Sequence, residues 1–301
     1  MSGAFELRAG AARLVIAPEV GGSIAHYEHD GTPVLRPTSE HALAAGSVRE
    51  FACYPLLPFS NRIAGATLHW GGGSFALRRY MDTDPNAIHG NAWQRAWQVV
   101  ERDERGALLE LVHAPASGRS EEWPFAYRAQ QRFMLDAEGV SLHLQMRNDA
   151  ERAAPAGLGW HPFFPRPPGT ELEFRAQGVW YTDRALLPIE HSIVPSEWDF
   201  AQRRALGDVA IDNCFTGWRS PARVHWPARG TAAEISASTE CEDLVVYVPP
   251  GRDFLAIEPV THITDAFNRS SRGIAGTGTR TLAPGESFSC TMRLSLHHNH
   301  R

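Results

Sequence analysis

The sequence predicts an all-β protein, a large antiparallel sandwich or barrel with few short helices. Three observations support this class. Apolar and polar residues alternate in many short segments, turn signals separate these segments, and no long stretch has apolar residues at helical spacing. The chain has 301 residues, of which 43% are hydrophobic, so it can bury the core of one large domain.

The clearest element lies in the middle of the chain, where the spacing predicts a hairpin over 127–149. Tyr127, Ala129 and Phe133 share one face of its first strand, and arginine and glutamine side chains occupy the other. After a turn at 136–139, every second residue from Val140 is apolar. Further strands are expected at 12–18, 32–37, 74–79, 107–113, 233–239, 243–249, 253–259 and 288–296, with short helices at 42–52 and 196–202.

The order of these segments indicates a single domain over residues 1–301. Asp30-Gly31 marks a tight turn between two of the first strands, and no linker interrupts the chain. The richest loop, 270–285, leads directly into the last strand. The polar tail at 297–301 is expected to be frayed.

Composition excludes several classes of partner. The formal net charge is -5 and the charges are mixed along the chain, which does not suit a nucleic-acid-binding protein. No apolar run approaches the ~18 residues of a membrane span, and the N-terminal residues lack the apolar core of a signal peptide. Cys53, Cys214, Cys241 and Cys290 form no C-x-x-C pair and are expected to be buried free thiols in a cytoplasmic protein.

Two candidate site segments lie in the first third of the chain. The segment 51–66 leads through prolines and large apolar residues to Asn61-Arg62, where an arginine offers a rigid fork of donors. The segment 83–97 places His89 and Gly90 beside tryptophans, whose ring faces suit a polyol. Each segment also has a purely structural interpretation. Arg62 would then be a surface arginine at the end of a loop, and the segment 83–97 would be a turn with two core tryptophans.

Three further candidates interrupt apolar surroundings later in the chain. His161 lies in the stiff stretch GLGWHPFFP. It is interpreted either as a proton donor whose pKa is tuned by its surroundings or as a buried structural histidine. Asp212 follows an apolar pair of residues. It is interpreted either as a buried carboxylate with a hydrogen-bonding or charged partner or as an acid that caps its own turn. Glu258 ends an apolar strand, where burial would raise its pKa toward that of a general base.

These segments together resemble one family, the aldose 1-epimerases or galactose mutarotases. The resemblance rests on Asn61-Arg62-Ile63, His89-Gly90, Gly159-Trp160-His161-Pro162-Phe163, Asp212 before Phe215, and Ile257-Glu258-Pro259, in the family's order. It implies a large antiparallel β-supersandwich that interconverts the α and β anomers of a free aldose without a metal or organic cofactor. By this resemblance Glu258 is the general base and His161 the general acid, and Arg62, His89, Asp212 and Asn61 bind the sugar.

The sequence departs from the family pattern at two positions. Asn91 stands where many members have a second glycine after His-Gly, and Asn213 stands where many have a histidine after the aspartate. Both are expected in the substrate shell. A carboxylate such as Asp212 is also expected to hold the pKa of His161 up near neutrality.

Other readings remain open from the sequence. A hexose-phosphate or sulfosugar mutarotase would need extra cations at the cleft, for which Arg78, Arg79 and Arg95 are available. A non-catalytic sugar-binding protein would use the same fold without the acid and base. A glycosidase built on Asp212 and Glu258 would leave His161 without a role. No tight cluster of metal ligands appears, and the partner is expected to be a monosaccharide bound by a monomer or homodimer.

Overall fold

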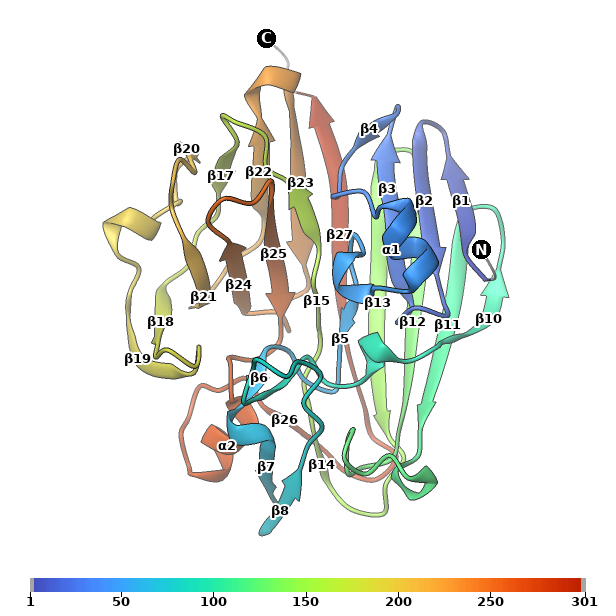
Figure 1. Cartoon of the computed structure of the whole chain (residues 1–301), viewed down its shortest axis with the longest axis vertical. Helices are drawn as coiled ribbons and strands as arrows, with labels where there is room; N and C mark the ends of the chain where they lie inside the picture. Colours follow the sequence, from blue (N-terminus) through green and yellow to red (C-terminus); the bar gives the residue numbers. More distant parts are fainter. Residues whose placement is uncertain (1–2, 299–301) are drawn as a thin grey trace.

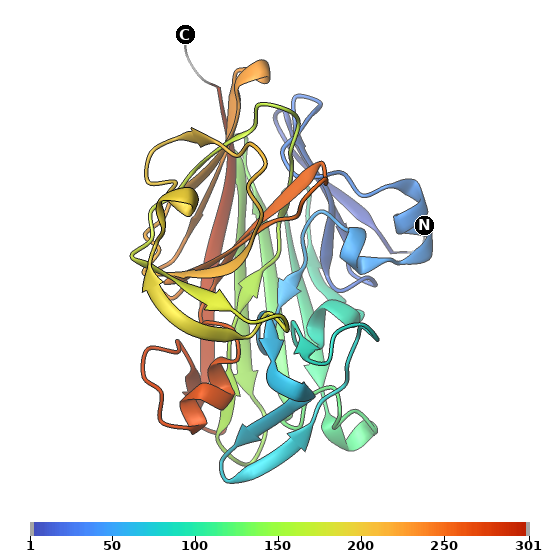
Figure 2. The same cartoon turned by 60° about the vertical axis from the view of Figure 1, so that its left-hand side comes forward.

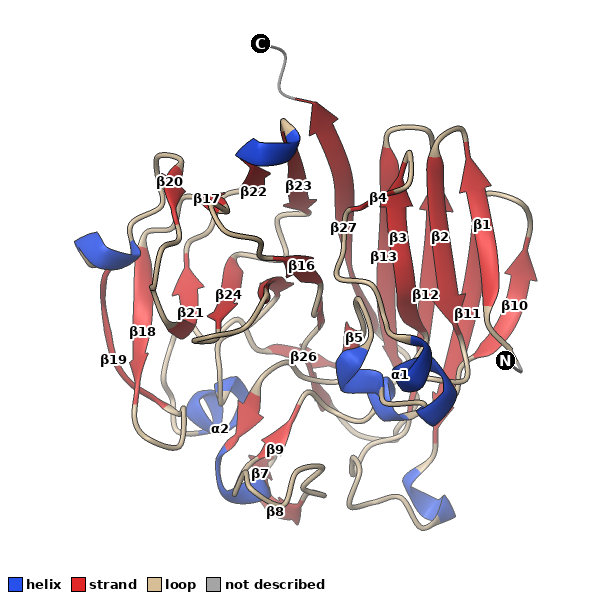
Figure 3. Ribbon diagram, turned by 45° about the horizontal axis from the view of Figure 1, so that its top comes forward, coloured by secondary structure: helices blue, strands red, loops and turns tan. Residues whose placement is uncertain are grey.

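A computed structural model gives the fold of residues 3–298, which is built almost entirely of antiparallel strands (Figures 1 and 3). The prediction of an all-β protein is confirmed. A nine-stranded sheet contains, in spatial order, β10 (Gln98–Arg102), β11 (Gly106–His113), β12 (Tyr127–Leu135), β13 (Gly139–Asn148), β27 (Ser287–His298), β23 (Thr231–Ala237), β22 (Ala222–Trp226), β17 (Glu171–Glu173) and β20 (Arg204–Ala205).

Two further sheets complete the framework. The eight-stranded sheet contains β19 (Pro188–Ile193), β18 (Gly178–Thr182), β21 (Ile211–Thr216), β24 (Asp243–Val248), β25 (Phe254–Val260), β15 (Gly159–Trp160) and β5 (Pro55–Leu56), with β16 (Phe163–Pro165) paired to β25. The four-stranded sheet contains β1 (Phe5–Ala9), β2 (Ala12–Ala17), β3 (Ser23–His29) and β4 (Thr32–Pro33).

Short elements connect these sheets. Paired short strands are β6 (Arg62–Ile63) with β9 (Ala87–Ile88), β7 (Thr67–Trp70) with β8 (Gly73–Ala76), and β14 (Ala154–Ala156) with β26 (Arg280–Leu282). The described part of the chain has two α-helices, α1 (Glu40–Ala45) and α2 (Ala266–Ser271). Its 3-10 turns are η1 (Val48–Glu50), η2 (Ala64–Ala66), η3 (Ala92–Gln94), η4 (Pro115–Ser117), η5 (Ser196–Trp198) and η6 (Pro227–Arg229).

The predicted hairpin forms the middle of the nine-stranded sheet. β12 and β13 pair in one register, with Phe133 opposite Leu142, and their apolar residues point into the core at every second position. Gln131 and, at the end of β13, Asn148 are the polar exceptions on this buried face. The alternation therefore determines which face of the sheet is covered.

The two other sheets pack against the nine-stranded sheet as a second layer (Figure 2). Tyr27 of β3 donates a hydrogen bond to the Leu294 carbonyl of β27 at 3.3 Å. Trp160 of β15 donates through Nε1 to Gln131 Oε1 of β12, also at 3.3 Å. Gln131 is thus the polar partner that lets an indole be buried between sheets.

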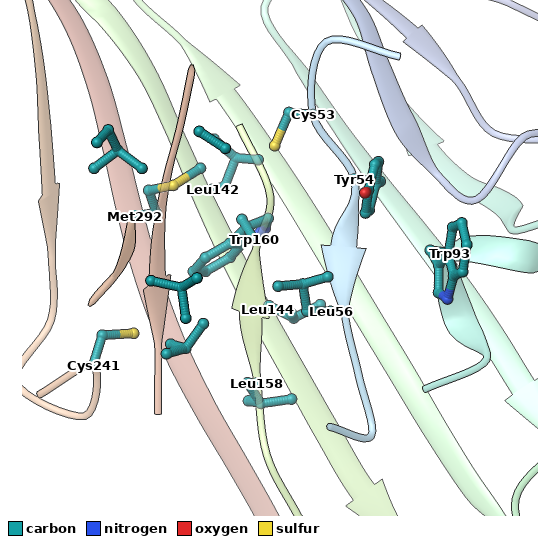
Figure 4. Close-up of a cluster of buried hydrophobic side chains, with 14 of the residues drawn as sticks. Cys53, Tyr54, Leu56, Trp93, Leu142, Leu144, Leu158, Trp160, Cys241 and Met292 are labelled. Atoms are coloured by element: carbon teal, nitrogen blue, oxygen red, sulfur yellow. The ribbon is translucent and has the colours of Figure 1, made fainter. Parts of the chain in front are cut away.

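The core is continuous between these layers. In Figure 4 the indole of Trp160 lies among leucines of both layers, including Leu144 and Leu158. All four cysteines are buried and unpaired, as the sequence predicts. They fill apolar space, and burial raises the pKa of the Cys53 thiol.

Several predicted boundaries differ from the structure. The strand expected over 32–37 ends at Pro33, because the N–H groups of Val34 and Leu35 both turn back to the Tyr27 carbonyl. The helix expected over 42–52 is α1 followed by η1, since Gly46 adopts a left-handed φ of 63° and ends α1. The helix expected over 196–202 is reduced to η5.

The C-terminal end also differs from expectation. His297 and His298 pair with β23 as part of β27, so these two residues are not frayed. Residues 299–301 of the predicted tail lie outside the described residues. Across 3–298, no helix has both the length and the apolarity that a membrane crossing requires.

Candidate active site

All six predicted site residues border one cavity of about 800 Å³. Its floor is formed by β21, β24 and β25 of the eight-stranded sheet, and its walls by the segments 46–50 and 88–94. The six residues are Asn61, Arg62, His89, His161, Asp212 and Glu258. The structure therefore brings together groups that lie up to two hundred residues apart in sequence, while their roles stay predictions.

His161 and Glu258 are in direct contact at the bottom of this cavity. His161 Nε2 lies 3.2 Å from Glu258 Oε1, and the side chains are 8% and 3% exposed. Glu258 lies within β25, and His161 lies between β15 and β16. The backbone N–H of His161 donates to the Tyr54 carbonyl at 2.9 Å. Because β16 pairs with β25, the backbone fixes the separation of the two side chains.

Burial moves the two pKa values in opposite directions. It lowers the pKa of His161 to about 3, with Arg36 and Arg49 acting in the same sense. It raises the pKa of Glu258 well above the ordinary value, and Asp212 adds to this effect while Arg62 opposes it. Both shifts favour the form of the pair that holds one proton, and either partner can carry that proton at no change in total charge.

The expected role of Asp212 toward His161 is wrong. The charges that act on the pKa of His161 are arginines, which lower it further, and Asp212 acts on Glu258 instead. Burial raises the pKa of Asp212 itself, with Arg62 opposing. Asp212 lies on β21 opposite Tyr247 of β24, in the part of the cavity floor that these two strands form.

His89 is held by a reciprocal pair of bonds with Asn61. The backbone N–H of Asn61 donates to His89 Nδ1 at 3.1 Å, and the backbone N–H of His89 donates to the backbone carbonyl of Asn61 at 2.9 Å. Both residues have left-handed φ angles, 54° and 62°. Since Nδ1 accepts, the proton of the neutral ring is on Nε2, and burial keeps the ring neutral by lowering its pKa.

Arg62 is fixed by two neighbours. Its Nε donates to Asp84 Oδ2 at 2.9 Å and its Nη1 to Asn61 Oδ1 at 3.2 Å. Asp84 was not predicted from the sequence, although its Asp-Pro-Asn setting is typical of a turn acid; it also accepts the Asn86 N–H. The remaining Nη2 has no partner among the described residues and is available to a ligand.

Aromatic rings line the same cavity. Phe163 stacks on His161 with ring centroids 4.3 Å apart, and Tyr54 lies 4.8 Å from His161 and 5.5 Å from Trp93. Trp93 borders the cavity, whereas Trp97 is a core residue that donates to the Ala92 carbonyl. Both tryptophans are core residues, 1% and 3% exposed, as in the structural alternative, although Trp93 also borders the cavity.

Two expectations about the surroundings of the site are wrong. Asn91 lies outside the cavity lining, because its side chain bonds Tyr127, His113 and Glu122 in the core. Asn213 also lies outside, donating to the Trp180 carbonyl.

The arginines that the sequence offers as cations for a charged sugar, Arg78, Arg79 and Arg95, do not border the cavity. Arg78 and Arg95 instead form ion pairs with Glu122. Between residues 3 and 298, no three His, Cys, Asp or Glu side chains are grouped as a metal site.

Comparison with known proteins shows the family of the chain. The family model for aldose 1-epimerase matches residues 3–295. The uncharacterized Escherichia coli K12 protein YphB is 32% identical over 300 residues, which is 97% of this chain and 98% of YphB. The uncharacterized protein YihR from the same organism is 26% identical over 261 residues, covering 83% of this chain and 81% of YihR.

Solved structures give the same result for the fold. The crystal structure of a provisionally assigned aldose 1-epimerase from Escherichia coli K12 has a TM-score of 0.87 and 30% identity, covering 98% of this chain and 99% of that one. A galactose mutarotase-like protein from Clostridium acetobutylicum has a TM-score of 0.85 at 21% identity, with 97% and 94% coverage. The chain therefore belongs to the aldose 1-epimerase family.

Proposed function

We propose that this protein is a mutarotase, an isomerase that interconverts the α and β anomers of an aldose. The observation that carries the proposal is the 3.2 Å contact between His161 Nε2 and Glu258 Oε1 at the bottom of a cavity of about 800 Å³. One buried proton shared by two groups of different chemistry is what the opening of a hemiacetal requires. The unpaired buried thiols favour the cytoplasm as its location.

The chemistry needs one proton to leave and one to arrive. Glu258, as carboxylate, takes the proton of the C1 hydroxyl, and His161, as imidazolium, gives a proton to the ring oxygen. The C1–O5 bond breaks and the C1 carbonyl forms. The open aldehyde then rotates about C1–C2 and recloses, with the two groups reversing their roles.

The state of the free pair suits a reaction that runs both ways. With a single proton on two groups in contact, each ring opening moves the proton from one partner to the other through the substrate. Each closing moves it back, so no exchange with water is needed between turnovers. Burial of both side chains also strengthens their interaction with the reacting oxygens.

Two polar groups that border the cavity would hold the sugar. His89 presents Nε2–H, and Arg62 presents Nη2, each on a side chain fixed by its other nitrogen. Such donors match hydroxyl oxygens and fix the ring in one orientation. The apolar face of the sugar would lie against the rings of Tyr54, Trp93 or Phe163.

The test is mutarotation of freshly dissolved α-anomers, followed by optical rotation with and without protein. Glu258→Gln and His161→Asn should each lower kcat by about 10²–10⁴-fold while the melting temperature stays within a few degrees. Glu190→Gln is the matched control, because Glu190 is an exposed carboxylate outside the cavity. Activity of Glu258→Gln near that of the control would refute the base assignment. Sugar binding without any acceleration by the wild type would favour a non-catalytic sugar-binding protein.

A second candidate from the sequence, a mutarotase of a phosphorylated or sulfonated sugar, is favoured by one observation. Three arginines other than those expected from the sequence border the cavity: Arg36, Arg49 and Arg252. The reaction would be the same, and only the substituent of the sugar would differ.

A further inference from the structure

The rim of the cavity carries an excess of positive charge. Arg36 follows β4, Arg49 belongs to η1, and Arg252 lies in the turn between β24 and β25, so three separate segments direct a guanidinium to one opening. Among the described residues that border the cavity, Glu50 is the exposed carboxylate. We call the three arginines the rim arginines.

The rim arginines are not paired with carboxylates. Within residues 3–298, neither Arg49 nor Arg252 makes an ion pair or a side-chain hydrogen bond. Arg36 donates to the carbonyls of Phe51 and Arg49, at 3.1 and 3.3 Å, and forms no ion pair either. By contrast, Arg62 in the same cavity is paired with Asp84. The rim therefore offers guanidinium groups whose charge is left for a ligand.

The position of Arg36 relative to the catalytic pair is fixed by stacking. Its guanidinium lies over the ring of Phe163, 4.1 Å from the centroid, and over that of Phe254 at 4.5 Å. Phe163 in turn stacks on His161 at 4.3 Å. Arg36 is thus one aromatic ring away from the imidazole and cannot swing away without losing both stacks and both hydrogen bonds.

The proposed reaction places one part of the sugar near Arg36. His161 protonates the ring oxygen O5, which is bonded to C1 and to C5. Glu258 occupies the C1 side, so C5 and its exocyclic C6 extend on the side of His161. Because Arg36 lies behind the Phe163 ring that stacks on His161, we expect a group at C6, rather than one at C2 or C3, to lie nearest to Arg36.

From this geometry, we propose that the substrate is an aldose with a singly linked oxyanion at C6, held by Arg36, Arg49 and Arg252. The inference rests on the proposed mutarotase function and deepens it by naming the substrate class. Phosphate, sulfonate and carboxylate share the chemistry that a cluster of guanidinium groups recognises. Two of the three arginines are exposed, so their attraction also raises the rate of encounter with an anion.

The test compares kcat/KM for glucose and glucose 6-phosphate by exchange NMR, with the uncatalysed rate subtracted. Glucose 6-phosphate should be preferred by about tenfold or more, as hydrogen bonds to charged groups allow. In the double variant Arg49→Gln/Arg252→Gln this preference should fall by a similar factor. Arg105→Gln, which removes an exposed arginine outside the cavity, should retain the preference.

The outcomes separate the two proposals. Turnover of glucose with no preference for glucose 6-phosphate, or a preference unchanged in the double variant, would overturn the anion site and leave the mutarotase function standing. No turnover of either sugar, with a melting temperature raised by glucose 6-phosphate in the wild type but not in the double variant, would support the anion site and overturn the mutarotase function. Parallel assays with 6-deoxy-6-sulfoglucose and glucuronate identify which oxyanion fits best.

Discussion

At the scale of single residues, the surroundings of His161 and Glu258 disfavour charge on either group. Burial lowers the pKa of the imidazole to about 3 and raises that of the carboxyl. A charged histidine and a charged glutamate can exist together here only as a contact pair, which has no net charge. Transfer of one proton from Glu258 to His161 therefore converts the neutral pair into the carboxylate and imidazolium that the reaction uses.

The pH dependence of kcat/KM follows from these directions. As the pH falls, the pair keeps its single proton until His161 binds a second one near its pKa of about 3, so the acid limb lies there. As the pH rises, the pair loses its only proton above the ordinary carboxyl range, because the pKa of Glu258 is raised. Polarimetry at each pH, corrected for the spontaneous reaction, gives the profile. A limb in the ordinary carboxyl range, near pH 4.5, would contradict this assignment, because it would show that the pKa of Glu258 is not raised.

The sequence predicts some of these residues and not others, for a physical reason. Glu258 is a polar group in an apolar strand and His161 is one in an apolar, proline-rich stretch, settings that are costly without a function or a partner, so both stand out. Arg36, Arg49 and Arg252 do not stand out, because arginines are ordinary on any surface. Only the fold shows that three of them border one opening.

At the scale of elements, the turn from β9 into η3 depends on Gly90. This glycine has a φ of 67°, and a Cβ placed on it would lie 2.1 Å from the Leu57 carbonyl oxygen. Leu57 and Gly90 form an isolated bridge that brings the His89 turn against the segment leading to Asn61. The close approach of two backbones therefore positions His89 in the wall of the cavity.

We expect Gly90→Ala to destabilise the protein and to lower activity more than its stability loss explains. The matched control is Gly31→Ala, because Gly31 also has a φ of 67° but has open space around the added carbon. Gly31→Ala should cost about 1–2 kcal/mol, the conformational penalty alone. Urea unfolding and mutarotation rates of both variants measure the difference. Equal effects on stability and rate would show that the approach to Leu57 does not position His89.

Strands in which apolar and polar residues alternate are predictable from the sequence. Strands that depend on close contact between two distant backbone segments are not. The β12–β13 hairpin was predicted correctly because its alternation alone specifies a half-buried strand pair. β15 and β16 flank His161 in a stretch of glycines and prolines without such a period. The pairing of β15 with β25 depends on Gly159, where a Cβ would lie 2.7 Å from the Pro259 carbonyl oxygen, and no local pattern reveals that contact.

At the scale of the whole molecule, one hydrophobic cluster joins the three large sheets. It includes Leu14 of the four-stranded sheet, Leu142 of the nine-stranded sheet and Ile257 of the eight-stranded sheet, all essentially inaccessible to solvent. The cavity lies where segments from these sheets meet, so its geometry depends on the packing of both layers. The single domain predicted over 1–301 would unfold as one unit if this cluster is cooperative.

A pair of methionines tests that cooperativity. Met292 of β27 is 1% exposed within the shared cluster, whereas Met134 of β12 is 50% exposed on the outer face of the same sheet. Met292→Ala should lower the free energy of unfolding by about 2–5 kcal/mol and shift one calorimetric transition as a whole, because every sheet loses contacts with the same core. Met134→Ala, which removes the same atoms without opening a cavity, should change stability by less than about 0.5 kcal/mol. Two transitions in the wild type, or a Met292→Ala scan in which only part of the heat absorption moves, would show that the layers unfold independently and that the chain contains more than one domain.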